Sequence, residues 1–284
     1  MTEIKKEVLI TQSGVINSIK RYFGNEVKKM RKYSTPGEPN IHIVSPKNYD
    51  EYLSKTQQNK YQSAVGSLMY LCKHSRPYLT NNVRDLSRCM KMANKENYEA
   101  LMRTVKYVLD KEDIGLKLGP IKGDIGEFNL ECFSDSDWGG NEDNRKSISG
   151  WAIYVCGSLI SWGSKAQQSV ATSSSMAEYI AISEICKEIM FIRSSCEFLG
   201  VKIDLPIIVN VDNMGEIFMS ENDGLKKSRH IDIRYHFIRE FVDNGIVKIM
   251  FVKSENNKAD PFTKNLNKES LDRKLSSSLK SKGN

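Results

Sequence analysis

The sequence predicts an α/β fold: a mixed five-stranded sheet flanked by helices in the second half of the chain, preceded by a mainly helical segment. The first observation is that three short strand-like apolar runs after residue 128 precede a long helical pattern. The second is that strand and helix patterns then alternate, as expected when strand–helix–strand units pair in parallel. The third is a stretch with three glycines and one proline, residues 119–126, which indicates a linker.

The first half has the apolar spacing of several helices. Residues 10–23 show it first, with Val15, Ile16 and Ile19 on one face. A basic cluster at 28–32 and a Pro/Gly loop at 35–39 follow. Three further helical patterns cover residues 61–73, 80–92 and 97–110. We therefore expect a helical, basic segment ahead of the linker.

The second half begins with strand patterns at residues 130–135, 148–156 and 159–162. Gly157-Ser158 is a turn signal between the last two, so the three strands should form a meander. An amphipathic helix should cover 173–199 and end at Gly200, an ordinary residue after a helix C-terminus. The remaining expectations are a strand at 206–211, a short helix after it, a helix at 231–242, a strand at 246–252 and a short helix from 259.

These patterns divide the chain into four parts. We expect a helical segment at 1–118, a linker at 119–128, an α/β domain at 129–266 and a disordered tail at 267–284, because the tail is rich in Lys and Ser. The 284 residues, 39% of them hydrophobic, suffice for one large or two modest domains.

Charge is unevenly placed along the chain. Residues 1–125 carry 22 Lys and Arg against 13 Asp and Glu, a net +9, whereas the remainder carries 20 against 22, a net −2. A basic half favours a polyanionic partner, and a solubilising surface is the alternative. No apolar stretch approaches the roughly 20 residues of a membrane span, and the N-terminus has no signal-peptide pattern, so we expect no membrane partner.

The six cysteines show no Cys-x-x-Cys pair and no regular spacing. Several lie within apolar runs, as Cys132 and Cys156 do. We therefore expect free, largely buried thiols in a reducing compartment, and no zinc site.

Four acidic residues each end or follow an apolar run or open a helical pattern: Asp135, Glu178, Asp212 and Asp260. Carboxylates at strand ends and helix starts can converge at one edge of a sheet. Hard divalent cations such as Mg²⁺ prefer these oxygen ligands, and two such ions can promote phosphodiester cleavage. Taken singly, each acid has the alternative role of a surface residue or a helix cap.

Three blocks around these acids read Phe133-Ser134-Asp135-Ser136-Asp137-Trp138-Gly139-Gly140, Ser174-Ser175-Met176-Ala177-Glu178-Tyr179 and Ala259-Asp260-Pro261-Phe262-Thr263-Lys264. Together with further blocks, they resemble the ribonuclease H domain of copia-type (Pseudoviridae) retrotransposon Pol polyproteins. The further blocks are 145–151, 160–168, 211–213 and 229–240. The first half resembles the thumb/connection segment of the reverse transcriptase in the same polyproteins, at residues 19–23, 66–71, 76–77 and 106–109.

The resemblance implies a ribonuclease H-like fold and a metal-dependent endoribonuclease that cleaves the RNA strand of RNA–DNA hybrids. It implies that Asp135, Glu178, Asp212 and Asp260 are catalytic and hold two Mg²⁺ ions, with Mn²⁺ as an alternative metal. The RNA–DNA hybrid is the implied partner, and the polymerase palm of a related Pol chain is a second one. The implied location is intracellular, in a cytoplasmic virus-like particle or the nucleus.

The sequence also departs from the family pattern. Met176 stands where relatives carry an additional acid, and no Tyr-x-Asp-Asp polymerase motif occurs, so we do not expect DNA synthesis by this chain alone. The alternative is a catalytically silent, truncated or domesticated remnant that binds nucleic acid or a polymerase module. A transposase or integrase is disfavoured, because those sites place the glutamate last.

Other polar residues near these blocks have open roles. His230 and His236 are six residues apart, which is not one helix face, and they could contact substrate or pack. The run at 173–175 should cap the following helix. Lys165, Gln167 and Gln168 could contact a phosphate or sugar, or form a solvated turn. Asp137 and Asp232 are assigned to structure or surface.

Overall fold

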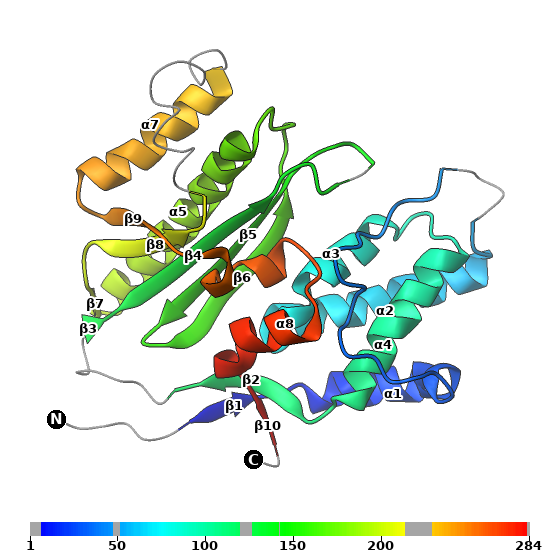
Figure 1. The fold of residues 1–284 in the computed structure, drawn as a ribbon. Helices are drawn as coiled ribbons and strands as arrows, with labels where there is room; N and C mark the ends of the chain where they lie inside the picture. Colours follow the sequence, from blue (N-terminus) through cyan, green and yellow to red (C-terminus); the bar gives the residue numbers. More distant parts are fainter. Residues whose placement is uncertain (1–6, 48–51, 120–126, 142, 214–228, 283–284) are drawn as a thin grey trace. The chain divides into compact units, whose positions relative to one another are not determined.

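A computed structural model describes residues 7–47, 52–119, 127–141, 143–213 and 229–282 of the chain (Figure 1). It divides into two compact units. The first unit contains Leu118–Gly140 and Arg145–Thr263. The second contains Leu9–Lys117, Asn141–Asn144 and the C-terminal segment from Lys264. The chain passes from the second unit into the first after Lys117 and enters the second unit again at Lys264.

A five-stranded mixed sheet forms the centre of the first unit. Its strands lie in the order β6-β5-β4-β8-β9. Their bounds are β4 (Leu130–Asp137), β5 (Ile148–Val155), β6 (Ser158–Ala166), β8 (Ile207–Val211) and β9 (Val247–Phe251). The first three pair antiparallel, whereas β8 pairs parallel with β4 and with β9. The predicted meander followed by parallel strands is confirmed.

The helices α5 (Ser174–Phe198) and α7 (Arg229–Asp243) cover the sheet and share one hydrophobic core with it. The core joins Ile182, Ile185 and Ile189 of α5 with strand residues such as Val209 and with Phe241 of α7. These apolar side chains are at most 6% exposed, so their burial is the main force holding helices and sheet together.

The start of α5 agrees with the capping expected from the serine run. The side chain of Ser173 accepts a hydrogen bond from the backbone nitrogen of Met176 at 3.2 Å. An N-cap serine satisfies one of the amide groups that lack a partner at a helix start. The cap fixes the first turn of α5, which carries Glu178 one turn further on.

The second unit is mainly helical, as predicted. Its elements are α1 (Ser13–Val27), α2 (Lys55–His74), α3 (Thr80–Arg88), α4 (Lys95–Asp110) and α8 (Lys268–Leu275), with a small sheet of β1 (Val8–Ile10), β2 (Ile114–Leu118) and β10 (Leu279–Ser281). Buried apolar residues of the first four helices include Ile19, Leu68, Leu86 and Leu101.

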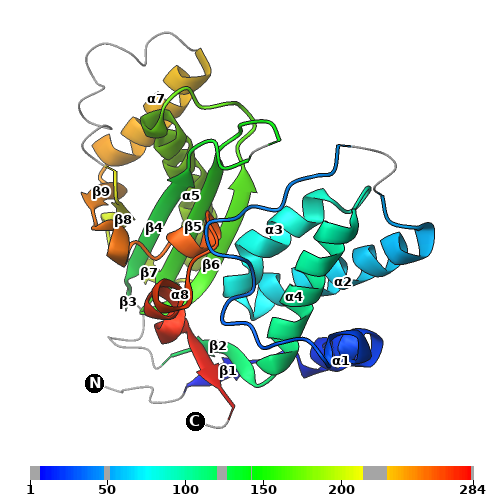
Figure 2. The same ribbon diagram turned by 45° about the vertical axis from the view of Figure 1, so that its right-hand side comes forward.

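The expectation of a disordered tail at 267–284 is wrong for residues 268–281. Asn267 caps α8 through a bond from the amide of Ser270, and Leu275 is fully buried. β10 then pairs antiparallel with β2, Leu279 opposite Leu116 (Figure 2). The composition of the tail predicted disorder because it is rich in Lys and Ser. The segment is ordered because Leu271 and Leu275 are buried and because β10 pairs with β2, which is distant in sequence.

The remaining sequence expectations have mixed outcomes. The short helix expected after residue 211 lies outside the described residues. The six cysteines are free, as expected, and three of them are buried. Burial raises the pKa of the Cys186 thiol to about 12. Among the described residues, no helix has both the length and the apolar character needed to cross a membrane.

Candidate metal site at the edge of the sheet

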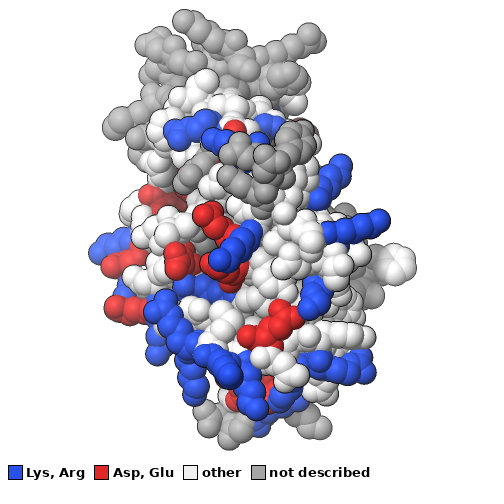
Figure 3. All heavy atoms as spheres, turned by 90° about the vertical axis from the view of Figure 1, so that its right-hand side faces the viewer, with Lys and Arg blue, Asp and Glu red and all other residues white. Residues whose placement is uncertain are grey.

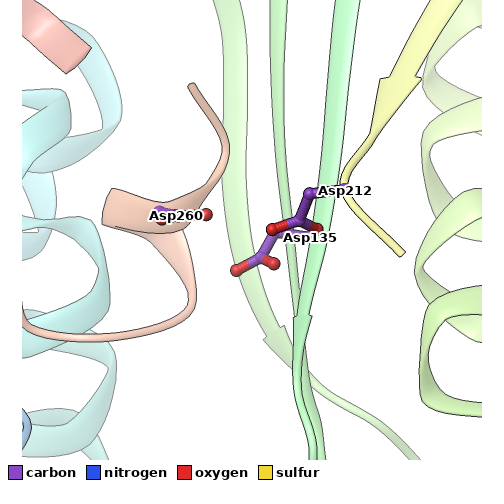
Figure 4. Close-up of side chains that lie close together, drawn as sticks. All are labelled: Asp135, Asp212 and Asp260. Atoms are coloured by element: carbon purple, nitrogen blue, oxygen red, sulfur yellow. The ribbon is translucent and has the colours of Figure 1, made fainter. Parts of the chain in front are cut away.

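Three aspartates from distant parts of the sequence converge in the first unit. One carboxylate oxygen from each of Asp135, Asp212 and Asp260 lies within 4.8 Å of the other two (Figure 4). Asp135 and Asp260 are buried, and Asp212 is half-buried. Such crowding of negative charge is costly unless a cation or a proton compensates it.

The register of two parallel strands sets the first pair. On β4 and β8, Phe133 lies opposite Asn210. Continuing this pairing by two residues places Asp135 beside Asp212, which directly follows β8. Because successive side chains of a strand alternate between the two faces, the two carboxyl groups emerge on the same side.

The third aspartate arrives on a tight turn, η5 (Asp260–Phe262). Buried Asn257 holds the entry to this turn, since its side-chain amide donates to the carbonyl oxygen of Ser134 at 2.9 Å. The side-chain oxygen of Asn257 also accepts from the amide of Ala259 at 3.0 Å. The turn is thereby attached to β4 one residue before Asp135.

Close approach of this turn to the sheet depends on Gly150, which pairs with Asp135 across β4 and β5. A Cβ atom at position 150 would lie 2.6 Å from Cγ2 of Thr263 and 3.0 Å from Cβ of Phe262. No side chain fits in that space. Glycine is therefore required here for steric reasons.

Glu178 lies next to the three aspartates on α5. Its Oε1 atom accepts hydrogen bonds from the backbone nitrogen of Ser136 at 3.2 Å and from the Ser136 hydroxyl at 2.8 Å. Its Oε2 atom is buried and has no hydrogen-bond partner within the described part of the chain. Glu178 is thus held in place by one oxygen, and the other remains available.

Burial is the main reason that the pKa of Glu178 lies well above its ordinary value of 4.5. The negative charge of Asp135 raises it further, the hydrogen bonds from Ser136 oppose the shift, and Asp212 adds to it. The protein thus buries an acidic group where its charged form is disfavoured. Sites with this property are often functional.

The donor set fits a hard divalent cation. All four groups offer carboxylate oxygens, the ligands that Mg²⁺ and Mn²⁺ prefer. The buried Oε2 atom of Glu178 is the kind of polar atom that a ligand would satisfy. Asp135, Asp212 and Asp260 could therefore hold a metal ion, with Glu178 beside them.

The structure shows the surroundings of three neighbouring polar residues whose roles were left open. Gln167 is buried and donates to the Ser149 hydroxyl at 3.0 Å and to the Ala177 carbonyl at 2.9 Å, so it braces the start of α5. Lys165 pairs with Glu184 at 2.7 Å on the surface. Gln168 is exposed to solvent.

The two histidines lie on α7. His236 is exposed, and the side chain of His230 lies outside the described part of the structure, as does that of Asp232.

Sequence reasoning missed three residues that support the site: Ser136, Asn257 and Thr263. Ser136 and Asn257 make the contacts described above, and the Thr263 hydroxyl donates to Oδ2 of Asp135. All three lie within three residues of one of the four acids. Ser136 and Thr263 also lie within the blocks that carry the family resemblance, but neither signal indicated which side chains would turn toward the carboxylates.

The second unit presents a basic surface of mixed character. Exposed Lys28, Lys29 and Lys32 follow the end of α1, whereas Lys20 and Lys60 form ion pairs with Glu112 and Glu26. On the face in Figure 3, Lys and Arg side chains are spread widely with acidic side chains among them. Positive charge is therefore available to a polyanion, but it is not confined to one stripe.

Comparison with known proteins gives close relatives in sequence. No family model matches the chain. The Retrovirus-related Pol polyprotein from transposon RE1 of Arabidopsis thaliana is 34% identical over 214 residues, 75% of this chain and 14% of that protein. The corresponding polyprotein from transposon TNT 1-94 of Nicotiana tabacum is 36% identical over 72% of this chain and 15% of its own length.

A shorter relative is Secreted RxLR effector protein 161 of Plasmopara viticola. It is 36% identical over 132 residues, which are 46% of this chain and 90% of the effector. Sequence of this type therefore also occurs in a protein much shorter than the polyproteins.

Similar solved structures include LC11-RNase H1 in complex with RNA/DNA hybrid, at 16% identity and a TM-score of 0.35 over 52% of this chain and 99% of that one. Another is the foamy viral protease-reverse transcriptase in complex with RNA/DNA hybrid, at 10% identity and a TM-score of 0.44. That match covers 82% of this chain and 27% of the viral one. The strand order, not these scores, defines the fold.

A three-stranded meander, a parallel fourth and fifth strand, and a helix between the third and fourth strands make this unit a ribonuclease H-like domain. The chain belongs to the retrovirus-related Pol polyproteins of copia-type retrotransposons. It spans about one seventh of the length of the curated polyproteins that it matches.

Proposed function

We propose that the chain is a metal-dependent endoribonuclease that cleaves the RNA strand of an RNA–DNA hybrid, as part of a retrotransposon reverse transcriptase. The observation that carries the proposal is the convergence of Asp135, Asp212 and Asp260 within 4.8 Å, beside a buried glutamate. The Pol relationship of the chain supports this reading of the carboxylates.

In this proposal the four carboxylates hold two Mg²⁺ ions, or Mn²⁺ in their place. Bound divalent cations activate water and stabilise the charge that develops on a phosphodiester in hydrolysis. The residues of the chain supply the geometry: β4 and β8 fix Asp135 and Asp212, η5 presents Asp260, and Ser136 orients Glu178. Exposed lysines of the second unit would attract the phosphates of the hybrid.

The test is cleavage of an end-labelled RNA–DNA hybrid by the purified full chain in Mg²⁺. Replacing Asp212 with Asn should abolish cleavage while thermal unfolding stays cooperative. The matched control is Asp243→Asn, because Asp243 is an exposed acid on α7 whose carboxylate lies 3.5 Å from the guanidinium group of Arg239. Cleavage by Asp212→Asn at the wild-type rate would contradict the assignment of the site.

The second candidate function is binding of nucleic acid or of a polymerase module without turnover. The observation that favours it is the short Plasmopara viticola relative, which is named as an effector and not as a Pol polyprotein. Retention of the hybrid in a mobility-shift assay, with no product in Mg²⁺ or Mn²⁺, would support this candidate over the first.

A further inference from the structure

The side chain of Thr263 contacts the proposed metal site from the far end of the η5 turn. It is fully buried, and its hydroxyl donates a hydrogen bond to Oδ2 of Asp135. The same hydroxyl oxygen lies 3.1 Å from the backbone carbonyl oxygen of Asp260. A hydroxyl has one hydrogen, and the charged carboxylate is the stronger acceptor, so the bond to Asp135 uses it.

This contact connects two of the converging acids through one short turn. Asp260 and Thr263 are three residues apart, and the amide of Thr263 bonds to the carbonyl of Asp260 at 3.1 Å. A single 3₁₀ turn therefore presents a carboxylate at its start and a hydroxyl at its end to the same strand. Gly150 opposite Asp135 leaves the space that lets the turn lie there.

The Thr263 hydroxyl can restrain the rotation of the Asp135 carboxylate. Rotation about the terminal bond of an aspartate side chain is soft, because this torsion has broad minima. Loss of the Thr263 donor would remove one restraint on this rotation of the Asp135 carboxylate. A donor bound to Oδ2 fixes the plane of the group and directs Oδ1 to a defined position.

We propose that Thr263 is a positioning residue, which orients the Asp135 carboxylate so that the three aspartates bind a divalent cation. It acts through Asp135 and contacts neither metal nor substrate. The inference rests on the proposed function only for the presence of the metal site. The site predicted from the sequence contains carboxylates alone, and the proposal adds the hydroxyl group of Thr263 to it.

Two variants of Thr263, made in the full chain, distinguish orientation of the Asp135 carboxylate from packing of the Thr263 side chain. Thr263→Val replaces the hydroxyl with a methyl group of similar size. Thr263→Ser keeps the hydroxyl and removes only the Cγ2 methyl group, which lies near Gly150. Calorimetric titration with Mg²⁺ and with Mn²⁺ in the absence of nucleic acid gives the dissociation constants. Thermal unfolding in EDTA shows whether each variant folds.

Thr263→Val should weaken metal binding by about 10-fold or more, the usual effect of losing a partner behind a metal ligand, whereas Thr263→Ser should stay within about 3-fold of the wild type. Equal metal affinity of wild type and Thr263→Val would overturn the proposal, and so would equal losses in both variants. Absence of metal binding by the folded wild type would overturn it too.

Hybrid cleavage by the wild type is measured separately. A wild type that binds metal and shows the Val–Ser difference, but does not cleave, would refute the nuclease function and leave the positioning role intact. If the wild type cleaves the hybrid but Thr263→Val binds metal as tightly as the wild type, the nuclease function would be supported and the positioning role of Thr263 refuted. The two proposals therefore fail on different measurements.

Discussion

Ser136 donates two hydrogen bonds to a single carboxylate oxygen of Glu178, from its backbone nitrogen at 3.2 Å and its hydroxyl at 2.8 Å. The other oxygen, Oε2, is buried without a hydrogen-bond partner in the described structure. A fold optimised for stability alone would not bury a carboxylate in this way. We propose that metal binding, and not stability, determines the residue at position 178.

The first prediction concerns the stability cost of Glu178. Its folded-state pKa lies above the ordinary 4.5, so the folded protein favours the protonated form. In EDTA, wild-type stability should therefore fall as pH rises from about 4.5 toward the folded-state pKa. Glu178→Gln should remove this pH dependence and raise the free energy of unfolding at pH 7 by about 1–3 kcal/mol, the cost of an unsatisfied buried polar group.

Glu184 is the matched control on the same helix. Partial burial opposes ionisation there, but hydrogen bonds from Lys165 and Lys187 prevail and lower the pKa of Glu184. Glu184→Gln should therefore not stabilise the protein at pH 7. Urea unfolding between pH 4 and 8 measures both variants. A Glu178→Gln variant that is less stable than the wild type in EDTA would contradict the prediction.

The second prediction concerns the close approach at Gly150. Gly150→Ala places a Cβ atom 2.6 Å from Thr263, so the turn that carries Asp260 must move. We expect a loss of about 1–3 kcal/mol in unfolding free energy, typical of overpacking, together with weaker Mg²⁺ binding. Chemical denaturation and calorimetric titration measure the two effects.

Gly66→Ala controls for the change of residue type. Gly66 lies exposed within α2, and a Cβ atom there meets nothing within 4 Å. Alanine should raise stability by up to about 1 kcal/mol in a helix interior and leave metal affinity unchanged. If both variants bound metal like the wild type, the steric role of Gly150 would be refuted.

The third prediction concerns the attachment of the turn to β4. Asn257→Asp keeps the shape of the side chain but removes the amide group that donates to the Ser134 carbonyl. The loss should cost about 1–3 kcal/mol, because a buried carbonyl then lacks its donor and a charge is buried. Metal affinity should fall as well, since Asp260 is three residues away.

Asn256→Asp provides the comparison, because Asn256 is the exposed neighbour of Asn257. It adds the same negative charge without touching β4, and we expect wild-type stability and metal affinity. Equal effects of the two variants would show that charge, not the hydrogen bond to Ser134, is responsible.

The fourth prediction concerns the C-terminal segment. Deleting residues 267–284 removes buried Leu271 and Leu275 and the strand partner of β2. We expect amide hydrogen exchange to rise throughout the helical unit, because its small sheet loses an edge and its core loses apolar contacts. Deletion of residues 283–284 alone should leave exchange unchanged. Protection equal to wild type in the longer deletion would contradict this expectation.

Much of the ribonuclease H-like unit followed from local pattern. Alternating apolar residues gave β4, β5 and β6, and the serine run with its apolar helix face gave α5, because these signals depend on neighbours in the sequence. The acidic residues could be selected because each lies beside such an element. The tail could not be assigned, since β10 pairs with β2, more than 150 residues earlier in the chain.

The sequence by itself determined the class of the sheet, its order of elements and the four acids Asp135, Glu178, Asp212 and Asp260. Tertiary structure alone decided how those acids are held. Each of the features that hold them depends on contacts between segments far apart in the chain. These features are the parallel register of β4 and β8, the space at Gly150, and the hydrogen bonds donated by Ser136 and Thr263. Local periodicity carries no information about such contacts, because packing and hydrogen bonding determine them only after the chain has folded.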